Sequence, residues 1–374
     1  MALINSSLLP ERVGHTTTFS FDNNNLINTT HVNCMTNCTS PQGNDDTIRY
    51  FCLPKNFPES CSAPSSNEIR LIEIFCTAVF VQNDIIVYIA LALGMPGSIF
   101  ALVTVSSLKY SPGMVYLGSL AVSDFLALVF ASIILVFFKV ADENESVLLK
   151  LKFIYAGRVF QAFSHWNLAL ICMERFITVR YPMCKSRFYS KRTVFLSLFI
   201  VLIISIVPTP FTFVSTFYYY GTYGPLETAQ TFLYQAVYIL VPGLIIYTLT
   251  FLTAIQLKSM AQYIRSMASS TTTPSSRSDA METKMTKMML LTSACFFVFA
   301  CPFGFIQCFD RIKFWYLKFD LCHLNESIYI YLFYTLYAVS FLNHAVNFYI
   351  YCACAKGFRK QFVRVVFSKC CAKN

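Results

Sequence analysis

Charged residues are scarce in this chain, at 13% of its 374 residues, whereas soluble domains usually carry about 25%. Trp occurs only twice and His only five times. Hydrophobic residues account for 56% of the chain, and the mean hydropathy is +0.54. This much apolar surface excludes an ordinary water-soluble domain and favours a protein that crosses a membrane several times.

Other absences narrow the function classes. The Cys and His residues lack the spacings of zinc ligands, and no glycine-rich phosphate loop occurs. His165 and His344 fall within apolar stretches, and we expect His165 to be a hydrogen-bonding core residue rather than a metal ligand. The net charge of +10 is divided among short loops, which argues against nucleic acid as a partner. We therefore expect neither an enzyme nor a bound cofactor.

Seven stretches are long and apolar enough to cross a ~30 Å hydrocarbon core, which takes about 20 residues of helix. Backbone groups in lipid must be hydrogen-bonded internally, so these stretches are predicted to be helices. They run over Ala78–Leu108, Pro112–Phe138, Phe153–Val179, Thr193–Val214, Ala229–Leu257, Lys287–Phe309 and Ile328–Ala355.

The sequence therefore predicts an all-α membrane protein with a seven-helix transmembrane bundle. The bundle is expected at residues 77–355, after a mostly disordered tail at 1–76. Residues 356–374 are expected to form an amphipathic eighth helix and a short tail.

Two signals predict the orientation of the chain in the membrane. Glycosylation sequons lie in the tail and in the loops after the second and sixth stretches, which a seven-span topology places on one side. Most of the 29 Lys and Arg residues lie on the other side. We therefore expect an extracellular N-terminus and a cytoplasmic C-terminus at the plasma membrane. The sequons are at Asn5, Asn28, Asn37, Asn144 and Asn325.

Asp124 lies inside the second stretch, where an ionisable group is costly unless it has partners. Ser164 in the third stretch and Asn343 and Asn347 in the seventh could supply oxygen atoms beside it. Such a set would suit a sodium ion. The alternative is a carboxyl group held by hydrogen bonds alone.

Glu174 and Arg175 end the third stretch, and Glu282 lies at the inner end of the sixth, judged by the helical rise per residue. We predict that Arg175 pairs with both acids and so ties the two spans together. Breaking such a pair would let the inner ends separate, as in a two-state switch. The alternative is an arginine that reaches out to the membrane surface.

The outer half of the third stretch carries Gly157, Arg158 and Gln161, which are predicted to line a ligand pocket. The Arg158 guanidinium could bind a carboxylate or an amide carbonyl in bidentate fashion; a salt bridge to Asp84 is the alternative. No Asp lies in this part of the stretch, so the usual counter-ion for an amine ligand is missing. The seventh stretch has no Lys, which excludes a retinal Schiff base.

Several motifs resemble those of rhodopsin-like G-protein-coupled receptors over about residues 78–371. Glu174-Arg175-Phe176 resembles their Asp/Glu-Arg-Tyr motif, and the segment ending at Asp124 resembles their span-two motif. The segment from Asn347 to Tyr351 resembles Asn-Pro-X-X-Tyr. Its Asn-Phe form also resembles invertebrate FMRFamide-type and related neuropeptide receptors.

This resemblance implies an extracellular ligand, with a neuropeptide favoured, and a heterotrimeric G protein at the inner face. It also implies arrestin and receptor kinases as further partners and a coupling role for Tyr351. Cys370 and Cys371, behind the eighth helix, are candidate palmitoylation sites.

The chain departs from the family pattern at several positions. Phe348 replaces the proline of the span-seven motif, and Ala300 replaces the usual Trp of span six. Lys150 occupies the position of the usual span-three Cys, so the usual disulfide cannot form. Instead we expect bridges within the outer tail and one link to Cys322 or Cys308, because the outer compartment is oxidising.

Other readings of the sequence stay open. The ligand could be a lipid or a small acid instead of a peptide. The lost Trp and Pro allow a non-signalling decoy receptor. A transporter or channel is disfavoured, because the spans show no inverted repeat and no chain of acids through the bundle.

Overall fold

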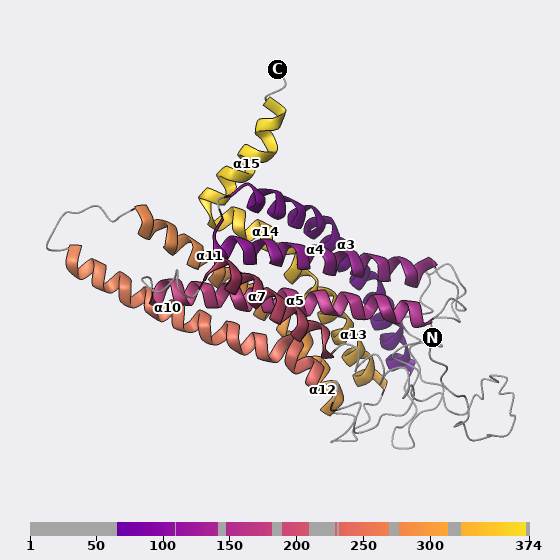
Figure 1. Ribbon diagram of the computed structural model, residues 1–374. Helices are drawn as coiled ribbons and strands as arrows, with labels where there is room; N and C mark the ends of the chain where they lie inside the picture. Colours follow the sequence, from indigo (N-terminus) through magenta and orange to yellow (C-terminus); the bar gives the residue numbers. More distant parts are fainter. Residues whose placement is uncertain are drawn as a thin grey trace, which may run out of the picture.

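The computed structural model describes residues 66–108, 110–140, 147–181, 189–208, 229, 232–268, 277–312 and 323–371. Within these ranges the ordered segments are helices that pack side by side as one bundle (Figure 1). They are α3 (Ser66–Ser106), α4 (Pro112–Val140), α5 (Val147–Arg180), α7 (Lys191–Ile206), η3 (Ala236–Leu240), α10 (Val241–Ala268), α11 (Arg277–Phe299), α12 (Cys301–Ile312), α13 (His323–Ser340), α14 (Leu342–Cys354) and α15 (Lys356–Cys371).

These helices make seven spans, because η3 continues into α10, α11 into α12, and α13 into α14. Four described segments are long and apolar enough to cross a membrane by themselves. The other three spans are α5, which carries several charges, α7, and the divided helix α13–α14. The four segments are Arg70–Ser106, Pro112–Val136, Phe232–Ser259 and Lys287–Phe309.

Helix α5 occupies the middle of the bundle. It contacts α4, α7, α10, η3 and α11, and its contact with α4 is the most extensive between any two described helices. Its inward-facing residues, including Leu168, Ile171 and Cys172, belong to the main hydrophobic core. Polar groups on α5 can therefore reach residues from several spans.

Two spans are interrupted near the middle of the bundle. The break between α11 and α12 precedes Pro302, which has no N–H to donate to the carbonyl of Val298. The break between α13 and α14 has no proline; instead Phe341 and His344 each donate a backbone hydrogen bond to the residue three positions earlier. This tighter turn sets the direction in which the polar residues of α14 point.

The helices extend beyond the predicted spans. Helix α3 begins at Ser66, so the boundary expected between tail and bundle at residue 76 falls inside this helix. The physical reason is that Ile72, although flanked by charged residues, is buried and continues the apolar contact of the helix. Helix α10 likewise continues to Ala268, and α11 already begins at Arg277.

Helix α15 leaves the bundle at a steep angle near the C-terminus (Figure 1). Phe358 and Phe362, one turn apart, contact the Phe348 ring, with centroid distances of 6.2 and 5.2 Å. Phe100 of α3 contacts Phe348 at 5.8 Å. Phe348, which replaces the usual proline, thus forms the centre of an aromatic contact between α3, α14 and α15.

We expect Gly94→Ala to destabilise the bundle by about 1–3 kcal/mol, the usual cost of overpacking a core. A Cβ atom at Gly94 would clash with the Leu128 side chain and would lie 3.0 Å from the Ala345 backbone. Gly357→Ala is the matched control, because a Cβ there meets nothing within 4 Å. Thermal unfolding of the purified protein measures both, and equal midpoints would contradict the close approach of α3 to α14.

Candidate functional site

The Asp124 carboxylate lies at the centre of a buried polar cluster that joins three helices. Ser164 of α5 donates to it at 2.5 Å, and Asn347 of α14 donates at 2.7 Å. His344, also on α14, lies 2.8 Å away through Nδ1. Asp124 is 1% exposed and His344 is 2% exposed. The costly charge in the core is therefore balanced by donors from two neighbouring helices.

Asn343 is buried on α14 but is not among the partners of Asp124. Successive residues of a helix point about 100° apart, since one turn takes 3.6 residues. Around α14, Asn347 lies about 40° from Asn343 and about 60° from His344. Asp124 lies on the His344 side of Asn347, and both hydrogen bonds to it come from that side. Of the predicted set, the structure thus brings Ser164 and Asn347 to the Asp124 carboxylate and places Asn343 beside neither of its oxygens.

In the structure the Asp124 carboxylate is held by hydrogen bonds, and the sodium site stays a prediction. Sodium prefers oxygen ligands, whereas a histidine nitrogen faces one carboxylate oxygen and the Asn347 amide nitrogen faces the other. Ser164 presents an oxygen to Asp124, and the buried Asn347 Oδ1 has no hydrogen-bond partner among the described residues. Within the described residues no group of three or more His, Cys, Asp or Glu could hold a metal ion.

His165 lies next to this cluster and links it to the fifth span. Its ring stacks on His344 with centroids 5.6 Å apart, and its Nδ1 lies 3.0 Å from the Tyr238 carbonyl. The Phe296 ring meets it edge-on at 5.0 Å. This hydrogen bond agrees with the role expected for His165. Phe296, one turn before Ala300, supplies a buried aromatic ring close to where the family has its Trp.

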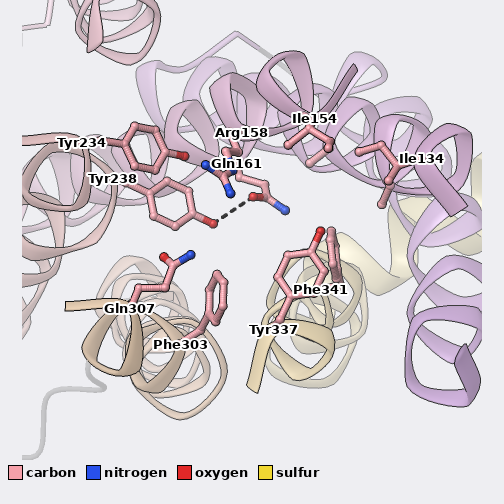
Figure 2. A pocket seen from close by; sticks show the side chains of 13 residues that line it. Ile134, Ile154, Arg158, Gln161, Tyr234, Tyr238, Phe303, Gln307, Tyr337 and Phe341 are labelled. Atoms are coloured by element: carbon pink, nitrogen blue, oxygen red, sulfur yellow. Dashed lines mark hydrogen bonds between the residues drawn. The ribbon is translucent and has the colours of Figure 1, made fainter. Parts of the chain in front are cut away.

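A small cavity of about 20 Å³ lies beyond His165. All three residues predicted for a ligand pocket, Gly157, Arg158 and Gln161, line it (Figure 2). The other lining residues come from the second, third, fifth, sixth and seventh spans: Ala127, Ala131, Ile134, Ile154, Tyr234, Tyr238, Phe303, Gln307, Tyr337 and Phe341.

Aromatic and amide groups surround the cation in this cavity. The Arg158 guanidinium carbon lies 5.8 Å from the Tyr155 ring centroid and 5.7 Å from that of Tyr234. The Tyr238 hydroxyl donates to the Gln161 side-chain oxygen at 2.9 Å (Figure 2). Tyr234 stacks on Tyr238 at 5.4 Å, at the point where the fifth span adopts the π-helical turn η3. Such turns are frequent at functional sites.

At the other end of α5, Arg175 lies against the acid that precedes it. The Arg175 Nε and Glu174 Oε2 atoms are 2.8 Å apart, and Thr178 donates to Glu174 at 3.2 Å. Burial raises the pKa of the nearby Tyr189 hydroxyl, and the Glu174 carboxylate raises it further, so this tyrosine stays neutral. A Cβ at Gly113 would clash with Arg175 and lie 3.3 Å from Glu174, so α4 closes over the pair.

Glu282 and Tyr351 are the other two residues predicted at this inner end of the bundle. The Glu282 side chain lies outside the described residues, so the pairing between spans three and six stays a prediction. Tyr351 is buried, and its hydroxyl has no hydrogen-bond partner among the described residues. Its ring packs against Phe358 of α15 at 5.7 Å.

Most predicted modification sites fall outside the described residues. This applies to the sequons at Asn5, Asn28, Asn37 and Asn144, to Cys322 and to the outer tail. The side chain of Lys150, where the family has a Cys, also lies outside the described residues. Asn325 lies in the first turn of α13, and Cys370 and Cys371 end α15. Cys308 is a free thiol in the structure. Its predicted partners in the outer tail lie outside the described residues, so this link stays a prediction.

Three residues of these sites were missed by the sequence analysis. His344 lies three positions before Asn347, but Asn343, four positions before it, fits the same face, so spacing alone could not choose between them. Tyr238 carries no signal of its own, because its position depends on the π-helical turn. Gly113 follows Pro112 at the start of α4, and this position already accounts for a glycine. The sequence therefore gives no sign that Arg175 lies close to it.

Seven membrane-spanning helices around a polar cavity and a buried carboxylate define a heptahelical membrane receptor. The family model described as 7 transmembrane receptor (rhodopsin family) matches residues 98–351. This match covers well over half of the chain, which therefore belongs to the rhodopsin family of seven-transmembrane receptors. A comparison with curated protein sequences finds no significant match.

We expect His344→Ala to lower the free energy of unfolding by about 2–3 kcal/mol, because it removes a hydrogen bond to a charged and buried group. Asn343→Ala, one residue away and equally buried, is the control and should cost clearly less. Thermal unfolding in detergent measures both. Equal losses would show that His344 acts only by filling space.

We also expect the wild-type protein to unfold at the same temperature in sodium chloride and in choline chloride. His344 and Asn347 already satisfy Asp124 with nitrogen donors, so a sodium ion would have to displace them. A midpoint that rises in sodium alone would instead support the sodium site expected from the sequence.

Proposed function

We propose that this receptor binds an extracellular ligand in the Arg158 cavity and activates a heterotrimeric G protein at its inner face. The observation that carries the proposal is the placement of two groups on one helix: Arg158 faces the cavity and Arg175 lies in the closed ion pair with Glu174. The two residues are 17 positions apart, about 25 Å along α5. A shift of one helix would therefore affect both ends.

The route between the two ends runs through the polar core. Tyr238 bonds to Gln161 in the cavity through its hydroxyl and to His165 through its carbonyl. His165 stacks on His344, which contacts Asp124. A ligand that moves Tyr238 would thereby change the packing around Asp124. It can favour a second state only to the extent that it binds that state more tightly.

In the second state the Arg175–Glu174 pair opens and the inner ends of spans three and six move apart. A cleft then forms in which Arg175 meets the G protein. Glu282 is the proposed partner of Arg175 on span six in the resting state, and Tyr351 is proposed to fill the space that Arg175 leaves. Arrestin and receptor kinases would use the same inner face after activation.

A peptide is the favoured ligand. The cavity has no Asp or Glu among its lining residues, so an amine would lack a counter-ion there. Its aromatic walls suit apolar side chains, and the long glycosylated tail suits the outer part of a peptide. The N-terminus is proposed to be extracellular, at the plasma membrane. A lipid or small acid is the second candidate, because the cavity combines one cation with apolar walls.

We expect Arg175→Ala to abolish receptor-stimulated nucleotide exchange on a purified G protein and to leave surface expression intact. The reason is that Arg175 is the cation exposed when the ion pair opens. Arg192→Ala, which removes an exposed charge at the start of α7, is the control and should retain exchange. Unaltered exchange by Arg175→Ala would exclude this mechanism, and no exchange by the wild type with any tested G protein would favour a decoy receptor.

A further inference from the structure

We infer that the Arg158 cavity receives a carboxylate, which is the terminal group of a ligand that enters with its acidic end first. This inference rests on the proposed function, because it assigns the ligand chemistry of the same cavity. Arg158 brings a permanent positive charge into the bundle, where an unpaired charge is costly. Its described neighbours are the tyrosine rings and amides of the cavity, and no acid lines this site.

The cavity is rich in donors and poor in acceptors. The buried Tyr234 hydroxyl has no hydrogen-bond partner among the described residues, and Figure 2 shows it beside the Arg158 guanidinium. Gln161 uses its oxygen to accept from Tyr238, which leaves its NH2 group to donate. Three donor groups from α5 and the fifth span thus surround one space.

A carboxylate matches this set better than the alternatives. It has two oxygens with about four acceptor sites, and a guanidinium binds it through two parallel hydrogen bonds. A carboxamide would turn its own NH2 toward groups that also donate. An amine would meet the positive charge of Arg158 and find few free acceptors.

The size of the cavity indicates which part of a ligand it takes. Its volume of about 20 Å³ exceeds the roughly 10–15 Å³ that one water needs. This space holds a group of a few atoms, not a whole peptide or lipid. The rings of Phe303, Tyr337 and Phe341 form an aromatic wall beside it, so the carbon next to the carboxylate is expected to carry an apolar or aromatic group.

The test uses the full-length purified receptor in lipid nanodiscs and three small probes. N-acetyl-phenylalanine offers a carboxylate beside an aromatic ring, and N-acetyl-phenylalaninamide is its neutral match. Hexanoate offers the same carboxylate on an aliphatic chain and separates a peptide-like source from a lipid-like one. Each probe is titrated to about 20 mM, since fragments of this size bind in the millimolar range, and the thermal unfolding midpoint is recorded.

We expect both acids to raise the midpoint and the amide to leave it unchanged. N-acetyl-phenylalanine should bind more tightly than hexanoate if the source is a peptide, and the reverse order would point to a fatty acid. Arg158→Gln should weaken acid binding at least about tenfold, because it removes a charge-assisted hydrogen bond. The control Lys152→Gln removes an exposed charge from the same helix and should keep the response.

The unliganded Arg158→Gln protein gives a second measurement. If no acid pairs with Arg158, its midpoint should stay close to that of the wild type, since the cost of an unpaired charge is removed together with two cation–π contacts. A clear drop would show that the chain supplies its own counter-ion, and this would overturn the inference. Tyr234→Phe, which removes one donor and keeps the ring, should weaken the acid response about threefold to tenfold.

Equal responses to acid and amide, or no response to either acid, would also overturn the inference. These outcomes are distinguishable from failure of the proposed function. Nucleotide exchange on the G protein depends on Arg175, so a receptor that activates the G protein and ignores both acids remains a receptor with another ligand chemistry.

Discussion

The bundle depends on the Asp124 carboxylate, a charge at membrane depth that must be neutralised or hydrogen-bonded. Ser164 on α5 and His344 and Asn347 on α14 meet this need, and three spans are thereby fixed at one height and in one rotation. The break at Phe341 is part of the same arrangement, because its tight turn directs the polar face of α14 toward α4. Removing any partner leaves a buried charge only partly compensated, which costs more than losing an apolar contact.

Aromatic rings pack around this cluster and around the end of α14. His344 brings a nitrogen donor to the carboxylate and stacks on His165, and Phe296 covers His165 from the sixth span. An aromatic cluster around Phe348 replaces the proline turn and joins α15 to α3 and α14. Aromatic contacts thus surround the polar cluster, and one of them stands where the family uses Pro. We propose that the two-state behaviour is retained through these contacts, with Arg175 as the group that changes partners.

The architecture could be predicted from the sequence because each span needs about 20 apolar residues, and such stretches are visible one by one. Pairs within the site were harder to predict. Arg158 and Gln161 follow from helical spacing on a single helix, and both line the cavity. The choice of His344 over Asn343 depends on the rotation of α14 after Phe341, and the position of Tyr238 depends on η3. Neither irregularity follows from local hydropathy, and the early start of α3 was missed because charges flank Ile72.

The distance between the inner ends of the third and sixth spans directly tests whether these ends move apart when the Arg175–Glu174 pair opens. Spin labels at Tyr181, just after α5, and at Lys287 of α11 are both exposed and can report it. The account predicts two distance populations, with the longer one enriched by a nucleotide-free G protein and by Glu174→Gln, which weakens the hold on Arg175. A single distance that neither the G protein nor the substitution changes would contradict it.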